Sequence, residues 1–336
     1  MLSRVILAAI AVSAVACRPR SRGSAAVALG AGALSAFVAG WGVAVDTVRS
    51  IGPMLLFLTA ALGLAALAER AGLSERGARM LARAGRGRSA RLYGLVCLAS
   101  AVFTCLVSLD GAVVLMVPLV RALERRCRLS APPFFVGAVA VANAISLAVP
   151  EGNPTNLVVM SRLGLSPAAY LGHLLVPGLC AAALCALVPL RLLVGGRYRF
   201  APRLDEPRRA PFLVPWRIGA QMAGLLASLD RLAPALSLHG GGFVALLAVA
   251  GGTGAAAAAA NNLPVSASVA ALATPGPGAY AALIGLSVGA LATAHGSVAT
   301  LIARDLAGDR RPWARTWALP TAAAVLLSTL LLWLLS

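Results

Sequence analysis

The sequence predicts an all-α, polytopic membrane protein, and two observations carry this prediction. Hydrophobic residues make up 60% of the 336 residues and charged residues only 12%, a balance that lies outside the range of soluble globular chains. The apolar residues also gather in runs of about 20 residues, which is the length of an α-helix that crosses a bilayer. The lipid bilayer is therefore the first partner that we expect.

The apolar runs define the expected helices in chain order. They cover residues 1–17, 24–45, 51–68, 92–120, 132–163, 167–190, 216–237, 241–276, 278–303 and 316–335. The first run follows an early arginine and ends in small residues, so it resembles a signal peptide. We favour an uncleaved first helix and keep cleavage as the alternative.

The arginines predict the orientation of these helices. All 29 basic residues are arginines and the formal net charge is +18. Five connections hold 25 of these arginines, namely 18–22, 69–91, 121–128, 191–217 and 304–315. The positive-inside rule places such connections in the cytoplasm, so we interpret them as orientation signals and expect no nucleic-acid partner. The bias toward Ala, Gly and Arg is typical of a GC-rich genome, and we expect a multi-pass protein of a bacterial plasma membrane.

Two segments are predicted to enter the membrane and turn back. Both connections that flank 92–120 are basic, so this segment should begin and end on one side as a re-entrant hairpin. Its tip, "SLDGA" at 108–112, would then lie near the middle of the membrane, buried in protein or facing water. The segment 241–276 has arginine-free flanks and should enter from the opposite face.

The stretch "LAVPEGNPTNLVVM" at 147–160 predicts a broken helix. Its two prolines and its glycine would leave backbone groups unsatisfied in hydrocarbon. A break inside the protein instead offers free N–H groups on one side and free carbonyls on the other, which can hold a polar solute. The alternative is a kinked structural helix whose polar groups satisfy one another.

The order of helix, hairpin and broken helix occurs twice. The second hairpin tip is "NNLPVS" at 261–266 and the second break is "TAHGSVAT" at 293–300. This order is typical of an inverted-repeat secondary transporter, whose site lies at the membrane midplane. We therefore divide the chain into N-terminal transmembrane helices (1–50), a first repeat (51–190), a basic cytoplasmic linker (191–217) and a second, shortened repeat (218–336).

Polar residues at the tips and breaks are the candidate site residues. Side chains that can bind a polar solute by hydrogen bonds are Asn153, Thr155, Asn156, Asn261, Asn262, Ser297 and Thr300, because amides and hydroxyls donate and accept. The candidates for proton or ion coupling are Asp110, Glu151 and His295, because ionisable side chains inside a membrane are costly and usually functional. Asp230 and Arg231 should form a local pair, and His173 and His239 receive no role.

Enzymatic chemistry is not predicted. The sequence lacks H-E-x-x-H and G-x-S-x-G motifs, which would mark metalloprotease and hydrolase sites. The six cysteines show no C-x-x-C spacing, so we interpret them as small core residues. We expect no catalytic residue, resident metal or cofactor.

Four motifs carry a family resemblance. "SLDGAVVLMVPLV", "PEGNPTNLVV", "NNLPVS" and "HGSVATLI" resemble motifs of the arsenical pump membrane protein (ArsB-like) family. That family lies within the ion transporter superfamily, which includes sodium/proton antiporters and citrate and dicarboxylate permeases. The resemblance implies re-entrant hairpins, a midplane site and proton-coupled efflux of arsenite or antimonite.

The sequence also departs from this pattern. Leu109-Asp110 stands where related chains usually have Asn-Asp, Glu151 adds a carboxylate to the first break, and Ala294-His295 replaces a common proline and apolar residue. These changes keep open a sodium- or proton-coupled permease for a carboxylate or other anion, or a sodium/proton antiporter. The partner is then a small inorganic or organic solute with a coupling proton or sodium ion. A homodimer also stays open.

Overall fold

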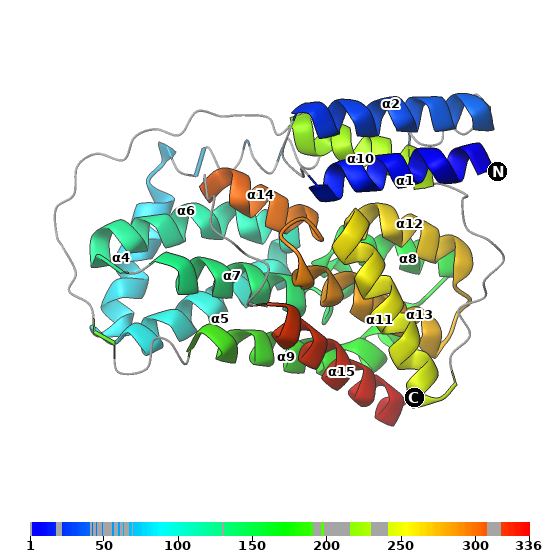
Figure 1. The fold of residues 1–336 in the computed structure, drawn as a ribbon. Helices are drawn as coiled ribbons and strands as arrows, with labels where there is room; N and C mark the ends of the chain where they lie inside the picture. Colours follow the sequence, from blue (N-terminus) through cyan, green and yellow to red (C-terminus); the bar gives the residue numbers. More distant parts are fainter. Residues whose placement is uncertain are drawn as a thin grey trace.

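The computed structural model describes residues 2–17, 22–40, 70–129, 131–190, 196–197, 216–229, 241–307 and 317–336, with isolated residues between 42 and 68. The regular elements in these residues are helices (Figure 1), and one isolated antiparallel bridge joins Arg88 to Arg197. The all-α prediction is thus confirmed for the described chain. The expected pair of Asp230 and Arg231, and His239, lie outside the described residues.

The described residues form fourteen α-helices and two short 3₁₀ helices. All overlap the predicted apolar runs in order except the helix at 73–85, which lies in the segment 69–91 that we expected to be a connection. They are α1 (Leu2–Cys17), α2 (Arg22–Ala39), α4 (Leu73–Gly85), α5 (Ser89–Val107), α6 (Leu109–Cys127), α7 (Ala131–Ile145), η1 (Pro150–Gly152), α8 (Pro154–Leu163), α9 (Pro167–Leu190), α10 (Trp216–Leu229), α11 (Phe243–Ala260), α12 (Asn262–Leu272), α13 (Pro277–Ser287), η2 (Gly289–Ala292), α14 (Val298–Ala307) and α15 (Ala318–Leu335). Among these described helices, α2, α5, α9, α11 and α15 are long and apolar enough to cross a membrane. They support the prediction of a polytopic membrane protein.

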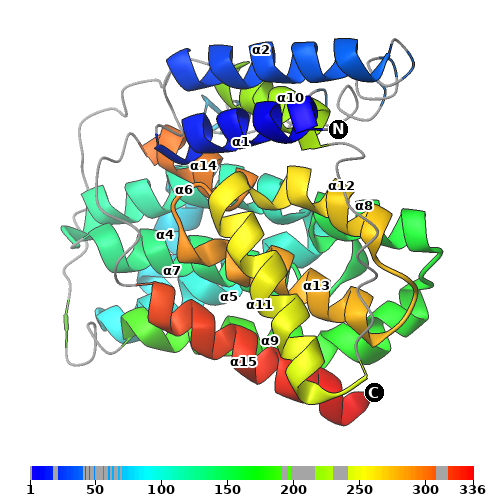
Figure 2. The ribbon, with the colours of Figure 1, turned by 45° about the vertical axis from the view of Figure 1, so that its right-hand side comes forward.

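Helices α1, α2 and α10 pack together beside a larger group formed by the other helices (Figures 1 and 2). The closest approach is between α2 and α10, where a Cβ atom on Gly224 would lie 2.1 Å from the carbonyl oxygen of Ala28. Gln221 of α10 donates a hydrogen bond of 2.7 Å from Nε2 to Ser24 Oγ of α2. Small residues and a buried polar contact thus hold this pair together, as in many membrane helix pairs.

Each predicted hairpin is a pair of helices separated by one residue. Ser108 divides α5 from α6, and Asn261 divides α11 from α12. Both residues have a positive φ, 105° for Ser108 and 82° for Asn261. Residues other than glycine rarely adopt this backbone conformation. In both pairs the two helices pack against each other. The same unusual backbone geometry therefore occurs at both predicted tips.

Each predicted broken helix is also found. The chain leaves α7 for η1 before α8 begins, and it leaves α13 for η2 before α14 begins. A Cβ atom on Gly152 would lie 2.6 Å from the carbonyl oxygen of Ser146, and one on Gly296 would lie 2.2 Å from that of Ala290. Each glycine precedes its helix by two residues and packs on the residue six positions earlier. The same tight fold of the backbone thus occurs in both halves.

Four of the five basic connections meet at one end of the larger group. Ser89 N donates to Gly196 O at 3.0 Å, Glu75 forms ion pairs with Arg125 and Arg126, and Arg121 Nη1 donates to Leu306 O at 2.9 Å. The α5–α6 pair therefore begins and ends at the same side of the molecule. Helix α5 by itself is long enough to cross a membrane, so its length does not fix how deep the tip lies. A tip near the middle of the membrane stays a prediction.

Candidate functional site

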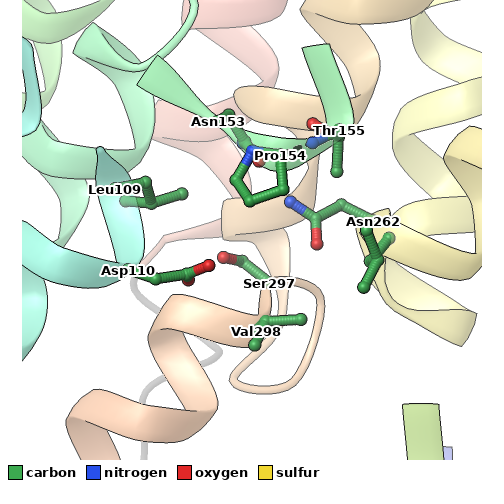
Figure 3. A pocket seen from close by; sticks show the side chains of 9 residues that line it. Leu109, Asp110, Asn153, Pro154, Thr155, Asn262, Ser297 and Val298 are labelled. Carbon is green, nitrogen blue, oxygen red and sulfur yellow. Dashed lines mark hydrogen bonds between the residues drawn. The ribbon is translucent and has the colours of Figure 1, made fainter. Parts of the chain in front are cut away.

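The starts of four helices meet at one small pocket. Its lining residues are Leu109 and Asp110 of α6, Asn153, Pro154 and Thr155 at the start of α8, Asn262 and Leu263 of α12, and Ser297 and Val298 at the start of α14 (Figure 3). Helix α6 packs against α14, and α8 packs against α12. Each predicted hairpin thus contacts the broken helix of the other predicted repeat, and both predicted tips and both breaks contribute lining residues.

The electrostatics of the pocket combine helix dipoles with one carboxylate. The N-terminus of an α-helix carries unpaired N–H groups and a partial positive charge, and four such ends face the pocket. Asp110 is the only charged side chain among the described residues that line it, and it is 6% exposed. In Figure 3 its carboxylate points toward the hydroxyl of Ser297. The site can therefore attract an anion at the helix ends and a cation at Asp110.

Three lining side chains have polar atoms ready to bind a solute. Thr155 Oγ1, Asn262 Oδ1 and Ser297 Oγ are buried and make no hydrogen bond to the described residues. Buried polar atoms in native proteins nearly always have a partner, and an unpaired one costs about 1–3 kcal/mol. Three such atoms around one pocket indicate a place where a polar ligand or an ion completes the hydrogen bonds.

The pocket is small in this conformation. The volume open to a water-sized sphere is ≈ 10 Å³, which is about the space of one water molecule. A water molecule or a bare cation fits this volume, whereas an organic acid does not. A larger solute therefore needs more room than the pocket offers in this conformation.

Two asparagines set the geometry of the helix starts that line the pocket. Asn153 caps α8, because its Oδ1 accepts a hydrogen bond of 3.1 Å from Thr155 N. Asn261 caps α12 in the same way, accepting from Leu263 N at 3.2 Å. Its Nδ2 also donates to His295 O at 2.7 Å, which ties the second tip to the second break. These caps satisfy end groups that would otherwise lack partners.

The structure brings together half of the ten predicted site residues. Asp110, Asn153, Thr155, Asn262 and Ser297 line the pocket. The other five do not. Thr300 is buried in α14 but is not a lining residue, and Glu151 is exposed in η1. His295 is half-buried beside the second break, and Asn261 caps α12.

Asn156 bonds to the backbone of the first break, whereas we expected it to bind the solute. Its Nδ2 donates to Ser146 O at 2.8 Å and to Val149 O at 3.2 Å, which are backbone carbonyls of the first break. Tyr170 of α9 acts in the same way, donating to Leu147 O at 2.9 Å. Sequence reasoning missed Tyr170, because nothing in its local sequence indicates that it reaches a break more than twenty residues away. It also missed the apolar lining residues, although each stands at or next to a predicted tip or break.

Comparison with known proteins agrees with this architecture. The chain matches the family described as citrate transporter (CitMHS) over residues 5–322. It is also similar to the inner membrane protein YbiR of Escherichia coli strain K12, at 32% identity over 84 residues. That second match covers 25% of this chain and 23% of YbiR, so it spans about a quarter of each protein.

The family match covers nearly all of the described helices and confirms the predicted ion transporter superfamily. It does not single out the arsenical pump branch that the motifs resemble. Together with the apolar helices, it indicates a membrane protein of a transporter family. On the match over residues 5–322, the chain belongs to the citrate transporter (CitMHS) family.

Proposed function

We propose that the chain is a cation-coupled permease for a small carboxylate, with the solute bound where α6, α8, α12 and α14 begin. The observation that carries this proposal is the meeting of four helix N-termini around unpaired hydrogen-bonding side chains. Helix N-termini bind anions because their N–H groups and dipoles favour negative charge. The family match to citrate transporters points to the same class of solute.

Asp110 supplies the coupling in this proposal. A carboxylate solute and an ionised Asp110 in the same pocket repel each other, since little solvent separates them. A proton or a sodium ion at Asp110 removes this repulsion. Binding of the cation and binding of the anion therefore favour each other, which is the thermodynamic requirement for cotransport. Asn262, Ser297 and Thr155 would orient the solute by hydrogen bonds, and Asn153 would hold the start of α8 in place.

The same observations support an inverted repeat with two hairpins that enter from opposite faces. The tips share a positive-φ residue, the breaks share a glycine two residues before the next helix, and each hairpin packs on the break of the other half. A pseudo-twofold axis in the membrane plane relates such halves in secondary transporters. We place the chain in a bacterial plasma membrane with its basic connections in the cytoplasm.

A second candidate function is proton-coupled efflux of arsenite or antimonite. The pocket lining contains no Arg, Lys or His among the described residues, and arsenous acid is mostly uncharged at neutral pH and presents hydroxyl groups. Hydroxyl and amide side chains suit such a solute without a fixed cation. The resemblance of the four motifs to arsenical pumps favours the same solute.

Transport by the purified chain in proteoliposomes separates the two candidates. We expect counterflow of radiolabelled citrate or a dicarboxylate, and we expect it to depend on protons or sodium ions. Arsenite should neither compete with the carboxylate nor enter the vesicles. Proton-driven arsenite uptake without carboxylate counterflow would refute the carboxylate proposal and establish the second candidate. Protein-free vesicles are the control for leakage.

A further inference from the structure

Helix α4 (Leu73–Gly85) lies at the basic end of the molecule. It has a buried side, an exposed side with arginines and an exposed apolar side. Ala78, Ala82 and Gly85 are buried, and the helix packs against α5 and α6. In Figure 1, α4 runs across the left-hand end of the larger helix group. It is short and strongly charged, so it does not have the composition of a membrane-crossing helix.

Two strips cover the surface of α4 that points away from the protein. The arginine strip consists of Arg76, Arg79 and Arg83, which are all exposed. The apolar strip consists of Leu73, Met80 and Ala84, with Leu73 52% exposed and Met80 67% exposed. At about 3.6 residues per turn, the residues of each strip lie on one side of the helix and the two strips lie next to each other.

Among the residues that the structure describes, none neutralises the arginine strip. Glu75 is the only acidic residue of α4, and it forms ion pairs with Arg125 and Arg126 of α6. Among the described residues, no acidic side chain pairs with the arginine strip. Arg86, Arg88 and Arg91 add further exposed positive charge directly after α4. The surface thus combines unpaired cations with exposed apolar side chains.

This combination fits the surface of a membrane better than water or a soluble partner. An amphipathic helix with basic and apolar sides lies in the membrane interface, where the apolar side enters the acyl region and the basic residues reach the headgroups. The cytoplasmic leaflet carries anionic lipids that attract basic residues near the surface. The helix lies where the bundle should meet this leaflet, because four basic connections converge at this end.

We propose that α4 lies in the cytoplasmic membrane interface and binds anionic phospholipid headgroups through Arg76, Arg79 and Arg83, with Leu73 and Met80 inserted beside them. This site anchors the α5–α6 hairpin to the leaflet, because α4 packs on both helices and Glu75 is paired with the end of α6. The proposal does not depend on the identity of the transported solute.

Lipid selectivity of the full chain tests this proposal. The protein is reconstituted in phosphatidylcholine bilayers that contain spin-labelled phosphatidylglycerol or spin-labelled phosphatidylcholine, and the immobilised lipid fraction is measured by electron paramagnetic resonance. We expect the wild type to prefer phosphatidylglycerol. Each arginine near the surface strengthens binding of anionic lipid about fivefold. The variant with Arg76→Gln, Arg79→Gln and Arg83→Gln should therefore lower the preference by up to about a hundredfold.

Three controls make the result decisive. A variant with lysine at the same three positions keeps the charge and should keep the preference, which separates lost attraction from misfolding. Arg162→Gln removes an exposed arginine of α8 and should change nothing. Inorganic phosphate should displace no more labelled lipid than chloride does at the same ionic strength. A preference that survives in the glutamine variant, or displacement by phosphate alone, would overturn the proposal.

Depth measurements test the apolar strip independently. A spin label at Met80→Cys, in a background without other cysteines, should be more accessible to oxygen than to a water-soluble nickel complex. A label at Arg79→Cys should show the opposite order, because it lies on the neighbouring strip. Equal and high accessibility of both labels to the nickel complex would show that α4 is solvated, and the proposed lipid site would be wrong.

Discussion

At the scale of single residues, the two halves of the molecule supply different chemistry to one site. Ser108 and Asn261 occupy equivalent tip positions, and the next two residues are Leu109-Asp110 in one half and Asn262-Leu263 in the other. One hairpin thus presents a carboxylate, while the other presents an amide. Leu109 therefore adds an apolar side chain to the pocket, and the lining amides come from Asn153 and Asn262.

Asp110→Asn tests the coupling role. The substitution keeps the size of the side chain and its capacity for hydrogen bonds, but it cannot bind a proton and it carries no charge for a sodium ion. We expect the variant to lose uptake driven by a cation gradient while it still exchanges solute across proteoliposomes. Gradient-driven accumulation equal to that of the wild type would contradict a coupling role, and Glu151 or His295 would then be the next candidates.

Asn262→Ala tests the binding role. Because Asn262 Oδ1 has no hydrogen-bond partner among the described residues, its loss should leave the folded protein intact. A lost hydrogen bond to the solute should cost about 1–3 kcal/mol, or roughly tenfold to over a hundredfold in affinity. Isothermal titration calorimetry of the purified variant measures this effect.

Asn261→Ala is the matched control for that experiment. Asn261 bonds to Leu263 N and His295 O and does not line the pocket, so its loss should lower thermal stability, by about 1 kcal/mol for the cap alone. Unchanged affinity in Asn262→Ala would show that the side chain serves the structure and not the solute.

At the scale of elements, two tight backbone folds make the breaks. Gly152 and Gly296 let the chain pack on its own carbonyl oxygens, and polar side chains then satisfy the free backbone groups of each break. In the first break Asn156 Nδ2 donates to Ser146 O at 2.8 Å, and in the second Asn261 Nδ2 donates to His295 O at 2.7 Å. A broken helix is stable inside a membrane only when such partners exist.

Gly296→Ala tests the second fold. The new Cβ atom would lie 2.2 Å from Ala290 O, so the backbone must shift, and we expect a loss of stability of about 1–3 kcal/mol together with weaker solute binding. Thermal unfolding in detergent and solute titration measure the two effects. Gly251→Ala is the control, because a Cβ atom at Gly251 meets nothing within 4 Å. Equal melting temperatures of the two variants would contradict the proposed packing constraint.

At the scale of the whole molecule, the contacts among the basic connections define one end. The backbone bond between Ser89 and Gly196, the ion pairs of Glu75 and the bond from Arg121 to Leu306 join connections that are far apart in sequence. The positive-inside rule predicts that these connections share a compartment, and their contacts agree with it.

Labelling of single cysteines tests this topology. Arg88 and Arg128 are exposed at the two ends of the α5–α6 pair, and Gly241 is exposed before α11. In a cysteine-free background, Arg88→Cys and Arg128→Cys should react with a membrane-impermeant maleimide only from the cytoplasmic side. Gly241→Cys should react from the outside. Labelling of positions 88 and 128 from opposite sides would refute both the hairpin and the inverted repeat.

Much of the fold could be predicted from the sequence, because its signals are local. Three local features each carry a large free-energy cost in one environment. Runs of about 20 apolar residues are costly in water, and both arginines and the backbone groups freed by prolines are costly in lipid. From these local signals we could predict that the chain lies in a bilayer, the order of most helices, and the positions of both tips and both breaks. The match between the run 167–190 and α9 (Pro167–Leu190) is an example.

The membership of the site was decided by the tertiary structure. Asn153 and Asn156 are three residues apart and chemically identical, yet one lines the pocket and the other bonds to the carbonyls of Ser146 and Val149. Asp110 and Ser297 come from distant parts of the chain and meet because α6 packs on α14. Residue type determines which hydrogen bonds a side chain can make, whereas packing between helices determines which partner it reaches and which atoms remain unpaired for a solute.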